Sequence, residues 1–526
     1  MQKEVKACLV LCYVLGLICI RNTAGRPNIV FILTDDQDVF LNGTGPMDKL
    51  RQYIGSQGAI FSNMFVTAPL CCPSRSSILT GTYVHNHQTL NNSLDGNCSS
   101  TAWQRGPEQR TFVTSLKKAG YVTFFAGKYL NQYGDKTAGG VGHIPPGWDD
   151  WHGLKGNSVY YNYSLSVNGK EEKHGDNYAT DYLTDVINRK ATSFLNNHKL
   201  GIDSPFFMML STPSCHAPFT PAPQYSKRFA NISAPRTGSF NKLGTDKHWL
   251  IRQAKNPMSN DSLTYLDETF RNRWRTLLSV DDMIEDIVTL LDKRQLLNNT
   301  YILFASDNGF HSGQFSLPND KRQFYEFDIR VPLMVRGPGV AASQSKKELV
   351  LNIDLAPTFL DLAGIPPPDY MDGQSFKEIL LSSGEQAVNR TDFLVEHSGE
   401  YSYRHLGCPQ YNGQPLSNCF PDCVCEDSQN NTYLCVRRLS DVQNLMYCGL
   451  TDAELFIEAY DIAKDPDQLT NVASTMDVSV LESMEESLAT LASCTGTVCH
   501  DVKHARQRTS SKLTKSPFKQ KIFIEV

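Results

Sequence analysis

Residues 71–79 of this 526-residue chain read CCPSRSSIL, and their types could support nucleophilic chemistry on an anion. We expect a helix over Ser74 to Leu79, with Pro73 tolerated near its start. The N-terminus of a helix favours an anion because its backbone N–H groups point outward without partners. Arg75 would add positive charge at the same place. The alternative is that Cys71 and Cys72 are ordinary structural cysteines in front of a helix.

Acidic and amide side chains follow two apolar runs of strand length. Asn28 to Leu33 leads into Thr34-Asp35-Asp36, and Tyr301 to Ala305 leads into Ser306-Asp307-Asn308. Oxygen ligands of this kind suit hard cations such as calcium or magnesium. A helix cap or a turn is the alternative for either group alone. The patterns therefore predict carboxylates delivered at the ends of buried strands.

Strands and helices alternate over about the first 390 residues. This alternation predicts an α/β fold with a mostly parallel sheet flanked by helices. Polar residues at the carboxyl ends of such strands are where these folds place their sites. The predicted strands are Asn28–Leu33, Tyr121–Ala126, Pro205–Leu210, Tyr301–Ala305 and Val331–Val335, and the predicted helices are Phe112–Ala119, Arg271–Leu297 and Asp354–Ala363.

The pattern changes after about residue 390. Short strands at Tyr433–Arg437 and Leu455–Tyr460, many cysteines and a final helix indicate a smaller α+β unit. We therefore predict a signal peptide at 1–24, a catalytic domain at 25–390, a disulfide-rich C-terminal subdomain at 391–500 and a mobile basic tail at 501–526. A polyanion contact is the alternative for the tail.

Composition and the first residues indicate an exported protein. The chain is 40% hydrophobic with a formal net charge of −5, which argues against a surface generally suited to polyanions or nucleic acid. Lys3 and Lys6 precede the apolar run Ala7–Ile20, and small residues follow, as in a secretory signal peptide. A signal anchor is the alternative. No later segment has the length and apolarity of a membrane span.

Cysteine usage fits an oxidising compartment. Of 15 cysteines, three lie in the signal segment, six crowd between Cys408 and Cys448, and Cys494 and Cys499 form a close pair. These read as disulfides of the C-terminal unit. A zinc site at Cys419-x3-Cys423-x-Cys425 is the alternative.

The cysteine motif, with Leu79-Thr80-Gly81 behind it, resembles the signature of the type I sulfatase family. The resemblance implies an alkaline-phosphatase-like fold and the oxidation of Cys71 to formylglycine by a formylglycine-generating enzyme. A hydroxyl of the hydrated aldehyde would attack sulfur, and the second would expel sulfate. The resemblance also implies one calcium ion held by Asp35, Asp36, Asp307 and Asn308, with residue 71 beside them as a further ligand. Conversion would leave 11 cysteines in the exported chain, an odd number, so at least one is unpaired. Cys72 and Cys215 are the candidate free thiols, because both lie inside segments expected to form the active site.

Further positions match the family residue by residue. Lys128 in Ala-Gly-Lys-Tyr matches a sulfate-binding lysine, His216 in Cys-His-Ala-Pro matches a histidine near the leaving oxygen, and Lys321 matches a later lysine. Many members carry a histidine two residues after the first lysine. Leu130 stands there in this chain, and Asn131 is the candidate substitute.

Several segments, among them CCPSRSSILTGTYVHNH, KHWLIRQ and CFPDCVCED, carry a closer resemblance. It is to lysosomal sulfatases that remove the 6-O-sulfate of terminal N-acetylglucosamine from heparan sulfate and keratan sulfate. The alternatives are an extracellular heparan sulfate 6-O-endosulfatase, a catalytically inactive sulfated-glycan-binding protein and a phosphohydrolase on the same fold. The long basic insertion of the endosulfatases is absent, and Cys71 argues against the phosphohydrolase.

The remaining expectations concern sugar contacts and processing. A histidine-rich pocket would charge near pH 6 and attract sulfate, which suits an acidic lysosome. We expect a lysosomal protein reached through the secretory pathway, with secretion as the alternative, and a homodimer as an option. The candidate sugar contacts are His85, Asn86, His87, Asn131, His248, Trp249 and His311, and the glycosylation sequons start at Asn42, Asn91, Asn97, Asn162, Asn231, Asn260, Asn298, Asn389 and Asn430.

Overall fold

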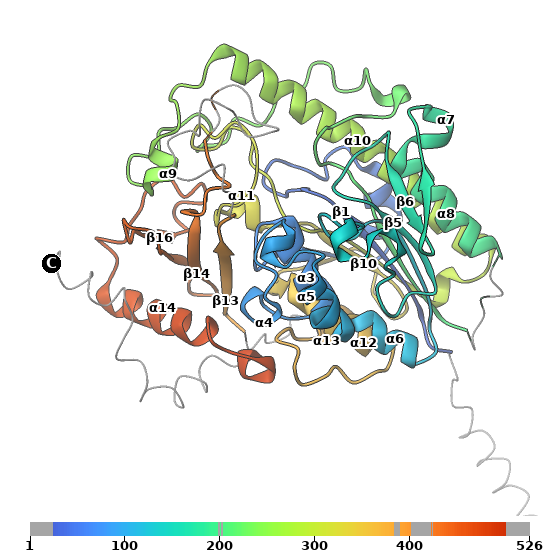
Figure 1. Cartoon of the computed structure of the whole chain (residues 1–526). Helices are drawn as coiled ribbons and strands as arrows, with labels where there is room; N and C mark the ends of the chain where they lie inside the picture. The colour runs from blue at the N-terminus through green and yellow to red at the C-terminus, as the bar shows by residue number, and fades with distance from the viewer. Residues whose placement is uncertain are drawn as a thin grey trace, which may run out of the picture.

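The computed structural model of the protein describes residues 25–197, 200, 204–382, 390–400, 422 and 424–500 (Figure 1). A mixed sheet of ten strands forms its centre, in the order β11-β2-β10-β9-β1-β8-β4-β5-β6-β7. Its strands are β1 Asn28–Thr34, β2 Ala59–Phe61, β4 Val122–Lys128, β5 Asp150–Leu154, β6 Ser164–Val167, β7 Lys170–Lys173, β8 Phe206–Ser211, β9 Thr300–Ser306, β10 Leu333–Arg336 and β11 Gln344–Lys346; β3 Met64–Phe65 pairs separately with β12 Val350–Leu351.

The middle of this sheet is parallel. β1 pairs with β9 on one side and β8 on the other, and β8 continues to β4 and β5. Every residue of β1, β8 and β9 is buried, which explains why these strands read as unbroken apolar runs. Their carboxyl ends therefore meet at one edge of the sheet, as the predicted α/β fold requires.

Helices cover both faces of the sheet. α8 (Leu183–Asn197) and α10 (Asn260–Lys293) pack on one face through a core that includes Val30 and Ile32. α3 (Cys71–Thr80), α6 (Phe112–Lys118) and α12 (Leu355–Leu362) pack on the other, around Phe31. The short helices are α2 Asp48–Leu50, α4 Val84–His87, α5 Thr101–Arg105, α7 Tyr178–Asp181, α9 Trp249–Arg252, α11 Glu326–Ile329 and α13 Lys377–Leu381.

A second, antiparallel sheet forms the C-terminal unit. Its order is β13-β14-β15-β16, with β13 at Asp392–Ser398, β14 at Thr432–Leu439, β15 at Asn444–Leu450 and β16 at Ile457–Asp461. α14 (Val478–Leu491) packs against it. The unit shares a core with the larger domain, because the rings of Phe65 and Phe393 lie 5.1 Å apart. The predicted fold class, an α/β domain with a smaller α+β subdomain, is confirmed.

Three elements differ from the prediction. α3 begins at Cys71, before the predicted start at Ser74. α10 begins eleven residues before Arg271, because Ser259 caps it by accepting a hydrogen bond from the Ser262 backbone N–H. β10 is present but runs antiparallel to both β9 and β2. An apolar run gives the burial of a strand and not its direction, so the sequence could not show this.

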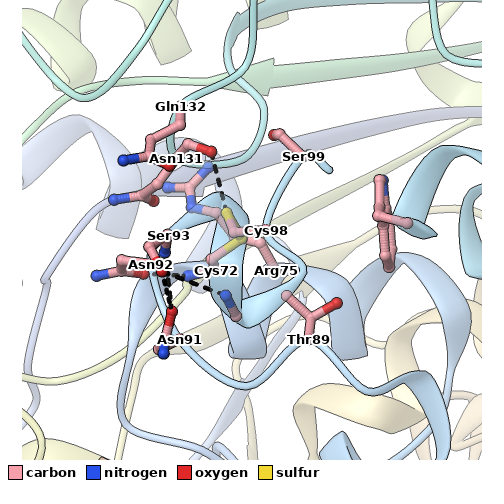
Figure 2. The surroundings of a disulfide bond; sticks show 12 residues. Cys72, Arg75, Thr89, Asn91, Asn92, Ser93, Cys98, Ser99, Asn131 and Gln132 are labelled. Carbon is pink, nitrogen blue, oxygen red and sulfur yellow. Dashed lines mark hydrogen bonds between the residues drawn. A yellow bond between two sulfur atoms is a disulfide. The ribbon is translucent and has the colours of Figure 1, made fainter. Parts of the chain in front are cut away.

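The disulfides correct one expectation about free thiols. Cys72 is bonded to Cys98, so it is not the free thiol that we expected (Figure 2). Among the described residues the free cysteines are Cys71 and Cys215, both buried. The bond fastens the start of α3 to the loop before α5.

In the C-terminal unit, Cys494 is bonded to Cys499, as expected. Cys435 is bonded to Cys448 across β14 and β15. Cys425 is also disulfide-bonded, which removes it from the zinc alternative.

Breaking the bond at α3 is expected to destabilise the protein. Cys98→Ser opens a loop closed over a sequence separation of 26. A loop of that length corresponds to about 3.5 kcal/mol of unfolding free energy in the chain-entropy account. Urea unfolding would measure the loss, with Cys215→Ser as the variant of a cysteine that carries no bond. Equal stability of Cys98→Ser and the wild type would contradict the structural role of this disulfide.

Some predicted features lie outside the described residues. They are the signal segment at 1–24, the tail at 501–526, the sequon at Asn389 and Cys408, Cys419 and Cys423. No helix in the described ranges is both long and apolar enough to cross a bilayer. Of the described sequons, those at Asn42, Asn162, Asn231, Asn260 and Asn298 are exposed, those at Asn97 and Asn430 are half-buried, and Asn91 is buried.

Candidate active site

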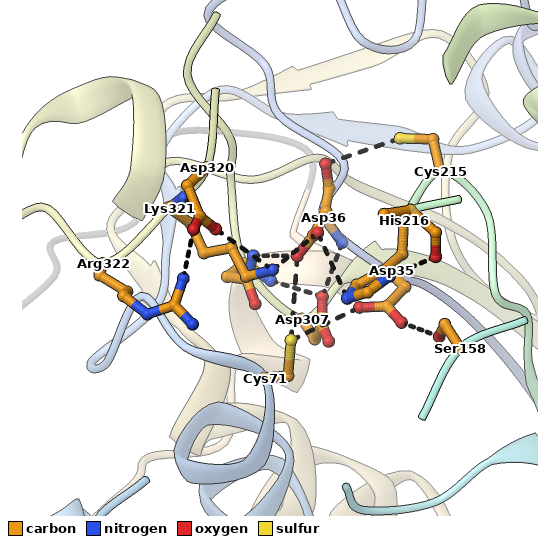
Figure 3. A network of polar contacts seen from close by, with 12 residues as sticks. Asp35, Asp36, Cys71, Ser158, Cys215, His216, Asp307, Asp320, Lys321 and Arg322 are labelled. Carbon is orange, nitrogen blue, oxygen red and sulfur yellow. Dashed lines mark hydrogen bonds and ion pairs between the residues drawn. The ribbon is translucent and has the colours of Figure 1, made fainter. Parts of the chain in front are cut away.

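Cys71 is the first residue of α3, directly after an extended Leu70. Its Sγ lies 3.7 Å from Oδ1 of Asp35 and 3.9 Å from Oδ1 of Asp36 (Figure 3). All ten residues of α3 are buried, so its N-terminus faces the interior of the domain. The cysteine thus lies where partly positive backbone N–H groups and two carboxylates meet.

Neighbouring strands deliver the other residues to this point. Asp35 and Asp36 follow β1, and Asp307 follows β9. Lys128 ends β4, while His216 follows β8. These strands lie side by side in the sheet, and their carboxyl ends form one edge. The structure therefore brings together residues as far apart in the chain as Asp36 and Asp307, which are separated by 271 positions.

Four oxygen-bearing side chains converge beside Cys71. Carboxylate oxygens of Asp35, Asp36 and Asp307 lie within 4.8 Å of one another. Nδ2 of Asn308 donates to Oδ1 of Asp36 at 2.8 Å. Oδ1 of Asn308 is buried and has no hydrogen-bond partner in the described structure. An unpaired amide oxygen among three carboxylates fits a hard divalent cation such as calcium or magnesium.

Three cationic side chains surround the carboxylates. Nζ of Lys128 donates to Asp35 at 2.7 Å, Nζ of Lys321 to Asp36 at 3.0 Å, and Nε of Arg75 to Asp307 at 2.7 Å. Lys128 is fully buried and Arg75 nearly so. Nη2 of Arg75 has no hydrogen-bond partner within the described chain. The arrangement could hold the oxygens of a sulfate between fixed positive charges.

The carboxylates of the cluster differ in how readily they keep their charge. Burial works to raise the pKa of Asp35, but Lys128, His216 and Arg75 outweigh it and hold the pKa well below its usual range. The pKa of Asp36 is lowered as well, chiefly by Lys321 against burial. Asp307 behaves differently, since burial raises its pKa to about 7 despite Arg75. Of these three carboxylates, Asp307 is therefore the one most readily protonated.

Cys71 and His216 also have perturbed acidities. Burial raises the pKa of the Cys71 thiol against the opposing pull of Lys128 and Lys321. Burial lowers the pKa of His216 although Asp35 and Asp36 act in the other direction. Nδ1 of His216 lies 2.7 Å from the Ala217 carbonyl oxygen, which can only accept, so Nδ1 carries a proton. Nε2 then faces the cluster, 3.9 Å from Asp36.

Sequence reasoning missed two polar side chains around the cluster. Ser158, in the loop after β5, donates its hydroxyl proton to Asp35. Arg322, next to Lys321, is paired with Asp320 (Figure 3). It is also paired with Glu400. Neither stands in a motif that would signal it. A serine or arginine in a loop carries no pattern of its own, so only the folded arrangement identifies them.

Several candidate sugar contacts have other partners. Nδ1 of His311 contacts Asp328 at 3.0 Å and Nε2 contacts Glu426 at 3.2 Å, and the residue is fully buried. His248 contacts Asp452 at 3.0 Å, joining α9 to the loop before β16. Trp249 donates to the same carboxylate. These three residues therefore contribute contacts that hold the two units together.

His85, Asn86 and His87 belong to α4, which follows the carboxyl end of α3. α3 spans about 15 Å, so α4 lies away from Cys71. Asn86 and His87 line a cavity of about 300 Å³ with residues 495–497 of the C-terminal unit. Asn131, another sugar candidate, is buried beside the Cys72–Cys98 bond, and its Oδ1 has no hydrogen-bond partner among the described residues (Figure 2).

His87 is not the charged histidine that we expected near pH 6. Burial lowers its pKa to about 3, and the ring bonds the Ser77 hydroxyl and the Thr89 backbone N–H. As pH falls, the imidazole of His87 is therefore protonated in the unfolded chain before it is protonated in the folded protein. This preference lowers the free energy of unfolding once the pH is below the pKa of the unfolded state. The loss should reach about 3 kcal/mol between pH 6.5 and pH 4. Urea unfolding measured over a range of pH should show that the free energy of unfolding falls less steeply toward acid pH in His87→Gln than in the wild type.

His85 supplies a control of opposite sign. Glu396 raises its pKa against burial, so its contribution is present at low pH and lost as pH rises through the folded pKa. His85→Gln should therefore lose most stability on the acid side. An acid limb unchanged in His87→Gln would contradict the neutral state assigned to His87.

Comparisons with known proteins agree with this geometry. The family model described as Sulfatase matches residues 27–365. N-acetylglucosamine-6-sulfatase of Homo sapiens is 53% identical over 494 residues, covering 93% of this chain and 89% of the relative. The protein of the same name from Capra hircus is 54% identical over 477 residues, covering 90% and 85%. The extracellular sulfatase SULF-1 homolog of Drosophila melanogaster is 43% identical, but the match covers 71% of this chain and 33% of that protein.

A solved structure supports the fold. The structure of BT4656 in complex with its substrate D-glucosamine-2-N,6-O-disulfate has a TM-score of 0.72 and 22% sequence identity. It covers 93% of this chain and 100% of that chain. With the family match and the long alignments above, the chain belongs to the sulfatase family and is a sulfuric ester hydrolase.

Proposed function

We propose that the protein hydrolyses the 6-O-sulfate ester of N-acetylglucosamine in heparan sulfate and keratan sulfate. The choice of sugar is supported by relatives named N-acetylglucosamine-6-sulfatase, which are 53–54% identical over most of the chain. The observation that carries the chemistry is the position of Cys71 at the N-terminus of α3, with carboxylates within 4 Å and lysines beyond them.

The cation of the proposal is a single calcium ion. Asp35, Asp36, Asp307 and Asn308 would hold it, and the unpaired Oδ1 of Asn308 supports this donor set. When bound, it would draw electron density from a sulfate oxygen and favour ionisation of the nucleophile. Lys128 and Lys321 already neutralise Asp35 and Asp36, so these two carboxylates stay ionised and ready to bind.

The nucleophile of the proposal is formylglycine made from Cys71. As a thiol, Cys71 is a poor nucleophile, because its raised pKa keeps it protonated at neutral and acid pH. Conversion would supply a hydroxyl nucleophile and a route for releasing sulfate. Arg75 and the N-terminus of α3 fix residue 71 beside the cation site, and Lys128, Lys321 and Arg75 hold sulfate oxygens. His216 faces the leaving oxygen.

The proposal carries the partners that such an enzyme needs. They are a formylglycine-generating enzyme during biosynthesis and a sulfated glycosaminoglycan as substrate. The lysosome, reached through the secretory pathway, is the proposed compartment. The numerous exposed sequons and the disulfides support an exported protein.

Two measurements test the function. Mass spectrometry of the tryptic peptide that contains residue 71 should show loss of the thiol and gain of an aldehyde; a free thiol in active enzyme would overturn the mechanism. Sulfate release should be rapid from 6-sulfated N-acetylglucosamine at a non-reducing end and slow from the 3-sulfated isomer. Assays at acid and neutral pH would separate a lysosomal from an extracellular enzyme.

An endosulfatase is the second candidate, supported by 43% identity to the Drosophila melanogaster protein. The chain spans about a third of that relative, whereas it spans 89% of the human N-acetylglucosamine-6-sulfatase. Heparan sulfate with blocked non-reducing ends would distinguish them, because only an endosulfatase would release sulfate from it.

A further inference from the structure

The long helix α10 supports two of the loops that form the site. Ser214, in the loop that carries His216, donates to the Thr276 carbonyl of α10 at 3.3 Å. One turn earlier, Arg273 points into the space behind Asp36. Its side chain is 2% exposed, so it has no direct route to solvent.

The guanidinium of Arg273 touches both loops that supply the oxygen donors. Nη2 donates to the Asp36 carbonyl at 2.8 Å and to Oδ1 of Asp38 at 3.0 Å. Its Cζ lies 3.8 Å from the ring centroid of Phe310. Phe310 stands two residues after Asn308, in the loop that follows β9. One planar group therefore joins the loop after β1 to the loop after β9.

Asp36 needs this support because its backbone is unusual. Its φ of 63° lies in the left-handed region, which residues other than glycine seldom adopt. The Asp36 backbone N–H donates to Asp307 at 3.0 Å, and the carbonyl is held by Arg273. The direction of the Asp36 carboxylate toward the cluster depends on this backbone conformation. A change at Arg273 would therefore act on the donor set without touching substrate.

We propose that Arg273 is a positioning residue for the cation site, which fixes the Asp35–Asp36 loop against the Asp307–Asn308 loop through its contacts with Asp36, Asp38 and Phe310. The inference rests on the calcium site of the proposed function. Groups behind the ligands of a metal site commonly change metal affinity by about 10–100-fold when replaced.

A lysine could not perform this role. Its ammonium is a point charge on a flexible stem, which could donate to the oxygens of Asp36 and Asp38 but has no flat face to stack on Phe310 as the guanidinium does. In Arg273→Lys the charge beside Asp38 is kept while the bridge between the loops is lost. This variant therefore separates charge compensation from geometry. Phe310→Leu removes the ring and tests the same bridge from the other side.

Arg275 offers a matched control on the same helix. It is 6% exposed, and its partners are the Arg228 carbonyl, Glu268 and Asn272, all outside the cluster. Arg275→Lys thus makes the same chemical change at a comparably buried position. Differences between the two variants report on the contacts of Arg273 alone.

Calcium affinity of the chelator-treated protein decides the proposal, measured by isothermal titration calorimetry on variants whose thermal unfolding shows a folded state. We expect the dissociation constant to rise about 10–100-fold in Arg273→Lys and to stay at the wild-type value in Arg275→Lys. Sulfatase activity of Arg273→Lys should recover toward wild type as calcium is raised to saturation. A purely structural role would not give this rescue. If Arg273→Lys does not fold, Phe310→Leu must show the same weakened affinity.

The outcomes separate the inference from the function beneath it. Wild-type affinity in folded Arg273→Lys, or an equal loss in Arg275→Lys, would overturn the positioning role and leave the proposed function standing. A wild-type protein that binds no calcium would overturn the cation site and the inference together. A wild-type protein that binds calcium but releases no sulfate would overturn the proposed function, and the affinity comparison would still decide the role of Arg273.

Discussion

Replacing Cys71 with alanine is expected to reduce sulfate release by about 10⁴-fold to 10⁶-fold, the range found when an enzyme loses its nucleophile. The reason is local. Cys71 is a free thiol at the N-terminus of α3, and its Sγ faces Asp35 and Asp36. The cationic side chains of Lys128, Lys321 and Arg75 would still bind sulfate, so the loss should appear in kcat with a much smaller change in KM.

Cys215→Ala is the control for this experiment. Cys215 is the other free cysteine of the described chain and is also buried, but its Sγ points to the Asp36 carbonyl at 3.6 Å, away from a sulfate held by the lysines. We expect it to keep most of its activity. Stopped assays on an aryl sulfate and on 6-sulfated N-acetylglucosamine would measure both variants. Activity of Cys71→Ala within about tenfold of wild type would contradict nucleophilic catalysis at this position.

The sequence predicted the carboxyl-end residues well because their signal is local. A buried parallel strand is an unbroken apolar run, and the polar residues just after it are visible in the sequence. Asp35, Lys128, His216 and Asp307 all stand at or soon after such runs. Since parallel strands share one edge, the pattern also implied that these residues meet, and the structure brings them together.

The sequence could not predict features that depend on distant partners. Cys72 was expected to be free because it lies inside the active-site motif, but it is bonded to Cys98, in the turn before α5. His311 and His248 were candidate sugar contacts in the sequence. In the structure His311 contacts Glu426, 115 residues away, and His248 contacts Asp452, 204 residues away, both in the C-terminal unit. Arg273 gave no signal, because one arginine within a helical pattern reads as solvated. Partners of buried polar groups are set by packing, which periodicity does not describe.

Replacing His216 with glutamine should reduce the activity on the natural substrate far more than the activity on a substrate with an activated leaving group. A sugar alcohol needs a proton to leave, while nitrophenolate leaves without one. Loss of a general acid costs typically about 10²-fold to 10⁴-fold, so we expect a loss of that size on 6-sulfated N-acetylglucosamine and a small loss on nitrophenyl sulfate. Comparing kcat/KM on the two substrates measures the difference.

Lys321 is the rival acid, and its environment argues against it. Burial works to lower its pKa, but Asp36 and neighbouring anions outweigh burial and raise the pKa well above its ordinary value, so its proton is held tightly. The pKa of His216 is shifted the other way, which makes its protonated ring the better donor. Lys321→Met should therefore reduce the activity on both substrates to the same extent, because a contact with the sulfate group is lost. The opposite result is that Lys321→Met keeps its activity on nitrophenyl sulfate while His216→Gln loses activity equally on both substrates. In that case Lys321 would be the acid, and Nε2 of His216 would be a sulfate contact.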